Sequence, residues 1–385
     1  MDNIKKTLTI NTRKYGILLS LIVISIFFAI ATKGLMLKPL NISNLILQNS
    51  YILILAIGML IIIVMGHIDL SVGSVVAFIG ALMGYMTEIW HWNPYISMLS
   101  LILIGAIIGA WHGMWVSVFK IPAFVVTLGG MLIFRGLALV LLGGSTLGPF
   151  PDQIAIISSG FIPGVRGAYN ITAIAVGIVL SILYAINEII KRRSGLKYGH
   201  DVTPLHLNIL KILGFVIVIN GFTFLLASYK GLPNVLILVA FLGVLYSFIT
   251  TRTVIGRRIY ATGGNPDAAK LSGINTNRLT FMAFVNMGVL CAISAIVFTA
   301  RLNSANSRAG TGFELDAIAA CVIGGTSFTG GIGTVPGVFI GTLVMGILNN
   351  GMSLLGIGID WQQVIKGLIL TFAVFFDIYT KRKSN

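Results

Sequence analysis

The feature of this chain that most constrains its fold is a series of apolar runs about 20 residues long, separated by short polar segments. Hydrophobic residues make up 56% of the 385 residues, and charged residues make up only 10%. Runs of this length suit membrane-spanning helices, whereas the strands of a membrane barrel are shorter and alternate in polarity. The sequence therefore predicts an all-α, polytopic helical membrane protein with about 10–12 transmembrane segments.

The apolar runs define the expected segments and one exception among them. The segment at 314–325 is too short to cross alone. We expect it to be a broken or re-entrant piece that continues toward Gly333, because irregular backbone at membrane depth must be buried in protein or line a cavity. The full set of expected segments is 15–32, 46–65, 70–88, 95–118, 123–143, 170–190, 209–228, 233–250, 280–300, 314–325, 335–356 and 361–379.

The basic residues indicate the orientation of these segments. The net charge is +15, and 18 of the 26 lysines and arginines fall in the segments assigned to the inside. Cytoplasmic loops of membrane proteins carry this excess. We therefore expect a multi-pass membrane protein with both termini cytoplasmic. The same distribution argues against a nucleic-acid partner and for contact with membrane lipid.

Two polar stretches separate the apolar runs. Residues 144–169 carry prolines and glycines and are expected to form ordered irregular structure outside. Residues 191–208 are expected to form a polar cytoplasmic hairpin or linker, which either makes a regulatory contact or, as we favour, is a solvated connection near anionic lipid. Cys291 and Cys321 lie in apolar surroundings and are interpreted as packing residues.

A short polar helix is predicted at 266–272, inside the most basic loop. Gly263 and Gly264 are expected to let the chain turn sharply, Asn265 to cap the helix, and Pro266 to occupy its first position. Asp267 suits the positive end of the helix, and Gly273 supplies a left-handed stop. A helix built this way on a basic loop favours presentation to another protein, and the alternative is a capped surface turn.

A second motif, Gly66–Ser74, interrupts two apolar runs with one charge, two hydroxyls and glycines. We expect a helix break in which Asp69 and Ser71 cap the following span. From residue types alone, a gate or path-lining element and a tight cytoplasmic turn are equally consistent with it. Asp69 becomes a functional candidate if it is buried.

The two halves of the chain echo each other. His112-Gly113-Met114 matches Asn350-Gly351-Met352, and Ile68-Asp69-Leu70 matches Phe313-Glu314-Leu315. Under the expected topology the copies run in opposite directions, as in the inverted repeats of transport proteins. The glycine-rich stretch 324–333 lacks the Gly-Lys-Ser/Thr ending of a phosphate loop, so it predicts unwound backbone or close packing and no nucleotide site.

Three stretches, Gly66–Ser74, Gly263–Ile274 and Ile323–Gly337, together resemble the membrane permeases of ribose- and xylose-type ABC sugar importers. They occur in the order of that family, and the similarity runs over nearly the whole chain. The length and the inserted apolar pair near 170–228 are more similar to the xylose or multiple-sugar branch. On this basis residues 1–385 form one permease domain, with repeats at 46–143 and 280–379, inserted spans and linker at 170–228, and a coupling loop at 251–279.

The resemblance implies a location in the bacterial cytoplasmic (inner) membrane, the function and the partners. The chain would be a non-enzymatic, membrane-spanning subunit that imports a monosaccharide, xylose or a related sugar, and it would form a homodimer. It would work with a cytoplasmic ATPase, which uses the ATP and Mg, and with an extracytoplasmic sugar-binding protein that docks on loops 144–169 and 301–316. This chain would bind no metal or cofactor itself.

The resemblance also implies site residues. The helix at 266–272 would be the coupling helix that docks in a groove of the ATPase, with Ala268 and Ala269 small enough for close docking. The coupling residues are Gly263, Gly264, Asn265, Pro266, Asp267, Ala268, Ala269, Lys270, Ser272, Gly273, Arg257 and Arg258. Candidates for the translocation path or gate are Asp69, Ser71, Asn303, Asn306, Glu314, Asn349, Asn350 and Gln362.

Two other classes of function compete with this interpretation. An ion-coupled secondary sugar transporter would carry ionisable residues inside its spans. Arg135 and Lys366 qualify, and Glu314 and Glu188 are further candidates, which is few for proton coupling. An integral-membrane enzyme would need a nucleophile with a base or a metal site. The five histidines are scattered without ligand spacing.

Overall fold

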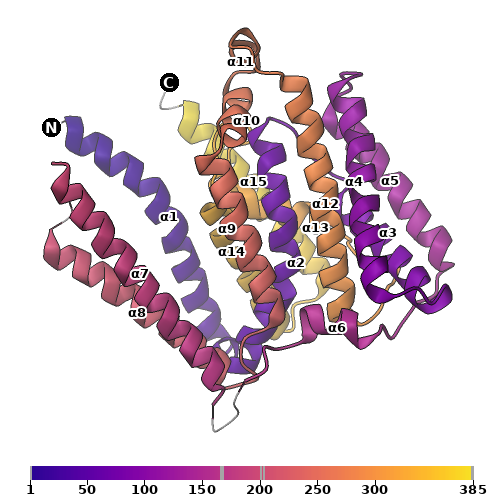
Figure 1. Cartoon of the computed structure of the whole chain (residues 1–385), viewed down its shortest axis with the longest axis horizontal. Coiled ribbons are helices and arrows are strands. Elements are labelled where there is room, and N and C mark those ends of the chain that lie inside the picture. Colours follow the sequence, from indigo (N-terminus) through magenta and orange to yellow (C-terminus); the bar gives the residue numbers. More distant parts are fainter. Residues whose placement is uncertain (1, 165–168, 200–201, 203, 383–385) are drawn as a thin grey trace. The chain divides into compact units, whose positions relative to one another are not determined.

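The computed structural model describes residues 2–164, 169–199, 202 and 204–382 and is shown in Figure 1. The described residues form helices and turns and contain no strand, only isolated bridges. This confirms the predicted all-α class. The helices are α1 (Asp2–Ala31), α2 (Pro39–Val64), α3 (Val72–Gly84), α4 (Pro94–Ser117), α5 (Ala123–Leu142), α6 (Asp152–Ser159), α7 (Ile171–Lys197), α8 (Leu205–Ala227), α9 (Asn234–Arg252), α10 (Val254–Gly264), α11 (Pro266–Leu271), α12 (Thr276–Leu302), α13 (Phe313–Ile323), α14 (Val335–Leu354) and α15 (Ile359–Arg382), with the 3₁₀ turn η1 (Leu35–Leu37) and the π turn η2 (Tyr85–Ile89).

Nine helical stretches in the described part of the chain are long and apolar enough to cross a membrane. They are α2, α3 continued by η2, α4, α5, α7, α8, α9, α12 and α14, and each corresponds to an expected segment. Helices also form at the first, tenth and twelfth expected segments, as α1, α13 and α15. The chain is therefore a multi-pass helical membrane protein.

Two polar stretches are more helical than expected. The 144–169 segment contains α6, an eight-residue helix from Asp152 to Ser159, so the prediction of wholly irregular structure there was wrong. Helix α7 continues to Lys197, well into the stretch that was expected to be a linker. Part of that stretch, His200, Asp201 and Thr203, lies outside the described residues.

The described chain forms two compact units. The first comprises residues 1–36, 45–159 and 235–385, and the second comprises 37–44 and 160–234. The core of the first unit is α2, whose residues from Ile54 to Val64 are almost all inaccessible to solvent. Beside it, α4 and α12 approach closely because glycines face each other. A Cβ atom on Gly105 would clash with the carbonyl of Gly288, and one on Gly288 with that of Gly105.

The tenth expected segment forms the short helix α13, and irregular backbone flanks it on both sides: at 324–333, where it was expected, and before Phe313, where it was not predicted. Helix α3 shows where the stretch before Phe313 runs. Gly84, at the end of α3, lies beside Leu147 and Ala305, Gly80 lies beside Thr299, and Gly73 lies against Gly310. From Gly84 to Gly73 the helix spans about 16 Å. The chain from Ala305 to Gly310 therefore runs along α3 to membrane depth in non-helical form, and α13 begins only at Phe313.

Arg135 supplies hydrogen bonds to this irregular stretch. Its Nη1 donates to the carbonyl oxygens of Ser307 at 2.9 Å and Ala309 at 2.6 Å. Unpaired backbone groups at membrane depth cost several kcal/mol each, so a donor from a neighbouring helix is needed where no helical partner exists. The charge that the sequence left unexplained inside α5 therefore holds the break in the tenth crossing.

The second unit is built around the hairpin of α7 and α8. Tyr184 and Phe215 stack with ring centroids 3.8 Å apart. Asn220 donates to Ser181 at 2.7 Å. The loops at the base of the hairpin are joined by hydrogen bonds from Ile162 to Leu232 and from Asn234 to Gly160. The hairpin is thus fixed by both apolar and polar contacts.

We predict that Arg135→Gln destabilises the protein, because the carbonyls of Ser307 and Ala309 lose a charged donor. The cost for a buried unsatisfied group is about 1–3 kcal/mol. The melting temperature of the detergent-purified chain measures it. The matched control is Arg308→Gln, which removes an exposed arginine from the same loop. Equal melting temperatures for the two variants would contradict the role assigned to Arg135.

Candidate coupling site and transport path

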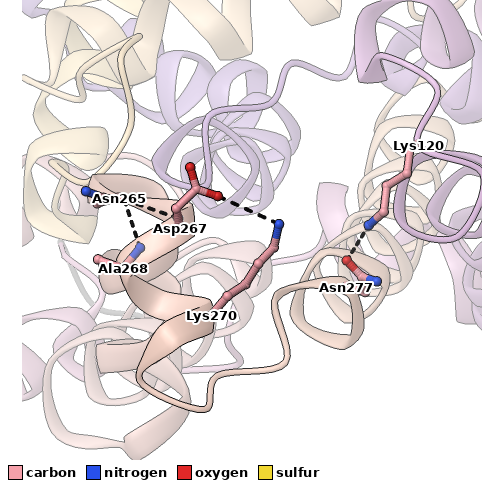
Figure 2. Close-up of polar contacts among 6 residues, drawn as sticks. All are labelled: Lys120, Asn265, Asp267, Ala268, Lys270 and Asn277. Atoms are coloured by element: carbon pink, nitrogen blue, oxygen red, sulfur yellow. Dashed lines mark hydrogen bonds and ion pairs between the residues drawn. The ribbon is translucent and has the colours of Figure 1, made fainter.

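Helix α11 has the ends that the sequence predicts. The Oδ1 of Asn265 accepts hydrogen bonds from the backbone N–H groups of Asp267 at 3.1 Å and Ala268 at 3.0 Å (Figure 2). Pro266 is the first helical residue, and Gly273 follows the helix with a φ of 78°. The cap, the proline and the left-handed stop are thereby confirmed. The helix ends at Leu271, and the hydroxyl of Ser272 donates to the carbonyl of Ala268 at 2.9 Å.

The prediction of a sharp turn at Gly263 and Gly264 was wrong. Both residues lie in the last turn of α10, and neither has a positive φ. Gly263 is required instead for a close approach, because a Cβ atom there would clash with the carbonyl oxygen of Val64 at the end of α2. Gly264 faces open space, where a Cβ atom would meet nothing within 4 Å.

The end of α10 meets two other backbones at one place. The N–H of Gly331 donates to the carbonyl of Val64 at 2.8 Å. A Cβ atom on Gly330 would lie 2.5 Å from the carbonyl oxygen of Gly263, and one on Gly331 would lie 2.9 Å from the Cα of Gly264. We call these five residues, Val64, Gly263, Gly264, Gly330 and Gly331, the glycine junction. It joins the coupling loop to α2 and to the 324–333 loop.

Tyr260 strengthens the same connection. Its hydroxyl donates to the carbonyl of Gly333 at 2.7 Å. Burial raises the pKa of Tyr260, so the phenol stays protonated and keeps this hydrogen bond over the physiological range. The glycine-rich stretch that resembled a phosphate loop is therefore a packing element against α10.

The exposed residues of α10 and α11 include charged side chains and three large apolar ones, Val254, Ile255 and Leu271. Arg257 and Arg258 are exposed on α10. On α11, Asp267 and Lys270 form an exposed ion pair with 3.9 Å between Nζ and Oδ1, a separation that contributes little in water. Ala268 is exposed as expected, but Ala269 is only 4% exposed, so it packs within the chain and is not a docking residue.

Leu271 is the residue that sequence reasoning missed. It is a large apolar side chain that is 91% exposed, at the last position of α11. One leucine in an apolar protein carries no signal in the sequence. Its position is informative only once α11 is seen to bury Ala269 and to leave Leu271 uncovered, in a loop outside the nine spans.

A further contact ties the neighbouring loop to the same end of the first unit. Lys120, in the turn between α4 and α5, donates a hydrogen bond to the side-chain oxygen of Asn277 at the start of α12 (Figure 2). Both segments were assigned to the inside from their charges. His67, in the turn after α2, is close enough to Lys120 to be affected by its charge. Burial, and then the charge of Lys120, lower the pKa of His67, which favours the neutral imidazole.

Asp69 and Ser71 form a turn that differs from the predicted cap. Asp69 is 3% exposed, and its Oδ1 accepts hydrogen bonds from the backbone N–H of Ser71 at 2.9 Å and from its hydroxyl at 2.6 Å. Ser71 occupies the N-cap position of α3, but its side chain caps no helical N–H because it donates to Asp69. Asp69 therefore shapes the break before α3, and its burial meets the condition set for a functional candidate.

The starts of α3 and α13 meet. A Cβ atom on Gly73 would clash with the carbonyl of Gly310 and with the carboxylate of Glu314. Glu314, half-buried in the first turn of α13, thus lies beside the first turn of α3. Two predicted path segments are brought together here, although they are separated by about 240 residues in the sequence.

Among the other path candidates, Asn303 and Gln362 make local hydrogen bonds. Asn303 is exposed, and its Oδ1 accepts from the N–H of Phe150 at 2.9 Å, which joins the loops on either side of this contact. Gln362 donates to the carbonyl of Ile357 at 2.8 Å in the turn before α15. Asn306 and Asn349 are half-buried, Asn350 is buried, and the Oδ1 of Asn349 has no hydrogen-bond partner in the structure.

Asp316 and Lys366 are a pair that the sequence did not connect. The Nζ of Lys366 lies 2.9 Å from Oδ1 and 3.1 Å from Oδ2 of Asp316, so the ion pair links α13 to α15. The pair is largely buried, with 10% of the aspartate and 24% of the lysine side chain exposed.

Both cysteines are buried and free, as predicted. Among the residues that the structure describes, no group of three His, Cys, Asp or Glu side chains is arranged for a metal.

In the described part of the chain, nine apolar helical stretches and a capped helix on a polar loop define a multi-pass membrane protein. The family described as branched-chain amino acid transport system / permease component matches residues 41–374, and the chain belongs to this permease family. No solved structure matches the chain significantly.

Relatives within the family are similar over nearly the whole chain. A xylose transport system permease protein, XylH, of Haemophilus influenzae is 39% identical over 98% of this chain and 99% of its own length. The XylH of Escherichia coli is 36% identical over 98% of this chain and 94% of its own. The ribose import permease protein RbsC of Escherichia coli is 33% identical over 88% and 85%. These similarities confirm the ribose- and xylose-type permease family indicated by the sequence motifs.

We predict that Gly263→Ala disrupts the glycine junction and that Gly264→Ala does not. A Cβ atom at position 263 meets the backbone of α2, and overpacking of this kind costs about 1–3 kcal/mol. At position 264 the added methyl meets open space. Melting temperatures of the two purified variants test the difference. A Gly263→Ala variant as stable as Gly264→Ala would show that the junction tolerates the shift.

Proposed function

We propose that this chain is the membrane-spanning subunit of an ABC importer that carries xylose, or a related pentose or hexose, into the cytoplasm. ATP hydrolysis, with its Mg, takes place in a separate ATPase subunit. Selectivity comes from an extracytoplasmic sugar-binding protein, and two copies of this chain enclose the path. The observation that carries this proposal is α11, a capped helix outside the spans that exposes Leu271 beside basic residues, in a chain of the permease family.

The composition of α11 fits docking into a protein groove. Leu271 supplies an apolar anchor, and burying a leucine contributes about 1.5–3 kcal/mol. Arg257, Arg258 and Lys270 are exposed in the same loop, and their positive charge suits a groove with an acidic rim. Asn265 fixes the helix without taking part in the contact.

The glycine junction provides a route for movement from that groove into the spans. A displacement of α11 reaches α10, whose end is in backbone contact with α2 and with the 324–333 loop. That loop connects α13 to α14, and α13 leads to the meeting point of Gly73, Gly310 and Glu314. Tightly packed backbones transmit displacement with little loss, because they cannot deform independently. We infer that this route couples the ATPase to the gate.

The outer loops suit docking of the binding protein. Leu147 and Ala305 pair through two backbone hydrogen bonds of 3.0 and 2.8 Å, and Asn303 binds the N–H of Phe150. Residues 144–150 and 303–305 therefore form one surface at the end of α3, and Arg135 holds the residues that follow, Ser307 and Ala309, by their carbonyls. A docked partner that moves this surface would act directly on the broken crossing.

The intramembrane charges favour this proposal over an ion-coupled symporter. Arg135 is bound to backbone carbonyls, and Lys366 is paired with Asp316. Proton relays need titratable groups that can exchange with water or substrate, and a guanidinium does not titrate in the useful range. These two residues therefore serve the broken crossing and its neighbours.

The sugar is proposed from the relatives. The two XylH proteins align over almost the full length of this chain and are more similar to it than RbsC is. The description of the family itself refers to branched-chain amino acids, so these belong among the compounds to be tested.

The transport prediction is tested by ATP hydrolysis in proteoliposomes that hold this chain with its ATPase, in the presence of the binding protein. We expect stimulation by xylose and weaker or no stimulation by ribose, galactose, glucose and arabinose. Leucine, isoleucine and valine serve as the amino-acid controls. Stimulation by an amino acid alone would overturn the sugar assignment, and uptake driven by an ion gradient without ATPase would overturn the importer assignment.

We predict that Leu271→Ala weakens binding of the ATPase by roughly tenfold to a hundredfold, which corresponds to about 1.5–3 kcal/mol of lost apolar burial. Co-purification and titration of the ATPase in detergent measure this change. The matched control is Leu355→Ala, which truncates an exposed leucine in the turn after α14. The docking role of α11 would be refuted if both variants bound the ATPase as the wild type does.

A further inference from the structure

The end of the α7–α8 hairpin combines two kinds of exposed side chain. We use the name hairpin end for residues 188–199 and 204–211. Glu188 on α7 is buried, and its Oε2 lies 2.8 Å from the Nζ of Lys211 on α8, with Lys191 3.5 Å from Oε1. This pair places residues 188 and 211 at the same level of the hairpin. Everything beyond it on both helices belongs to the hairpin end.

The α7 side of the hairpin end is basic. Lys191, Arg193 and Lys197 are exposed, and Arg193 and Lys197 are four residues apart, so they lie on one face of the helix. Between residues 188 and 211 the chain carries five lysines and arginines against Glu188 and Asp201, and Asp201 lies outside the described residues. Glu188 is already bound to Lys211 and Lys191, so it does not neutralise Arg193 or Lys197.

On α8, the part of the hairpin end beyond the Glu188–Lys211 pair exposes apolar side chains. Leu205, Ile209 and Leu210 are 57%, 47% and 66% exposed, and they lie beyond Lys211 toward the end of the hairpin. On α7, Leu196 and Tyr198 are 58% and 67% exposed among the basic residues. Exposed leucines interleaved with lysines and arginines at the end of a spanning helix match the boundary between acyl chains and headgroups.

From this juxtaposition we propose that the hairpin end binds the headgroups of anionic phospholipids. Lys191, Arg193 and Lys197 contact the phosphates, and Leu205, Ile209 and Leu210 lie among the upper acyl groups. A water-exposed surface for an acidic protein would not place these aliphatic side chains beside the charges. Clusters of four to eight lysines and arginines at the end of a spanning helix attract anionic lipid by about 1 kcal/mol per charge. The Glu188–Lys211 pair holds both helices in place beneath the cluster.

The test is native mass spectrometry of the full-length chain, titrated with phosphatidylglycerol or with phosphatidylcholine of the same acyl chains. We expect the wild type to retain phosphatidylglycerol preferentially. The variant Lys191→Gln/Arg193→Gln/Lys197→Gln should lose at least about tenfold in apparent affinity for phosphatidylglycerol, since three charges are removed. Glu188 and Lys211 are left intact, so that the hairpin keeps the ion pair that joins α7 to α8, while the pair between Glu188 and Lys191 within α7 is removed.

The charge-matched control is Lys33→Gln/Lys38→Gln/Lys230→Gln, which removes three exposed lysines from the loops after the first and seventh expected segments; these loops lie outside when the N-terminus is cytoplasmic. It should keep the wild-type preference. An equal loss in both variants, or no loss in the α7 variant, would overturn the proposal. If the α7 variant does not fold, the salt dependence of phosphatidylglycerol binding by the wild type tests the proposal instead. Binding that does not weaken with added salt would contradict a site made of exposed charges. Displacement of the lipid by inorganic phosphate would indicate a free-phosphate site instead.

Discussion

The structure depends on satisfying the backbone of the one crossing that is not a continuous helix. Residues from Asn303 to Gly312 run beside α3 without helical hydrogen bonds, and lipid offers no partner for their carbonyls. Arg135 meets this need from α5, and the close approach of Gly73 to Gly310 excludes lipid from the other side. Because the break must be enclosed in protein, α3, α5 and α13 are held together around it. A guanidinium inside a span is therefore a structural requirement of this fold.

Close contacts between backbones also fix the opposite end of the first unit. At the glycine junction, three segments distant in the sequence approach so closely that a methyl group on Gly263 has no room. Side-chain contacts can rearrange when one helix moves, but backbone contacts leave little freedom. The loop that carries α11 is thus fixed to α2 and to the loop before α14, while α11 itself stays exposed. A partner that displaces α11 acts on the buried centre of the unit.

The prediction of α11 shows what local chemistry can specify. Asn265, Pro266 and Gly273 act through their own backbone and the next few residues, so the cap, the start and the stop were predictable without a fold. Gly263 shows the opposite case. Its sequence context indicated a turn, yet its role is to let the chain approach Val64, about 200 residues earlier in the sequence. The burial of Ala269 and the exposure of Leu271 were not predictable either, because which residues of a six-residue helix are buried depends on the segments that pack against it.

The sequence by itself determined the membrane class, the positions of the spans, the shortness of the tenth segment and the caps of α11, because each follows from apolar length or from contacts within a few residues. It also carried enough motif information to indicate the permease family. Only the tertiary structure decided what Arg135 and Lys366 bind, why Gly263 is a glycine, and which side chain of α11 is exposed. These depend on residues 50 to about 200 positions apart. Such contacts are fixed by the packing of helices against one another, which no local pattern encodes.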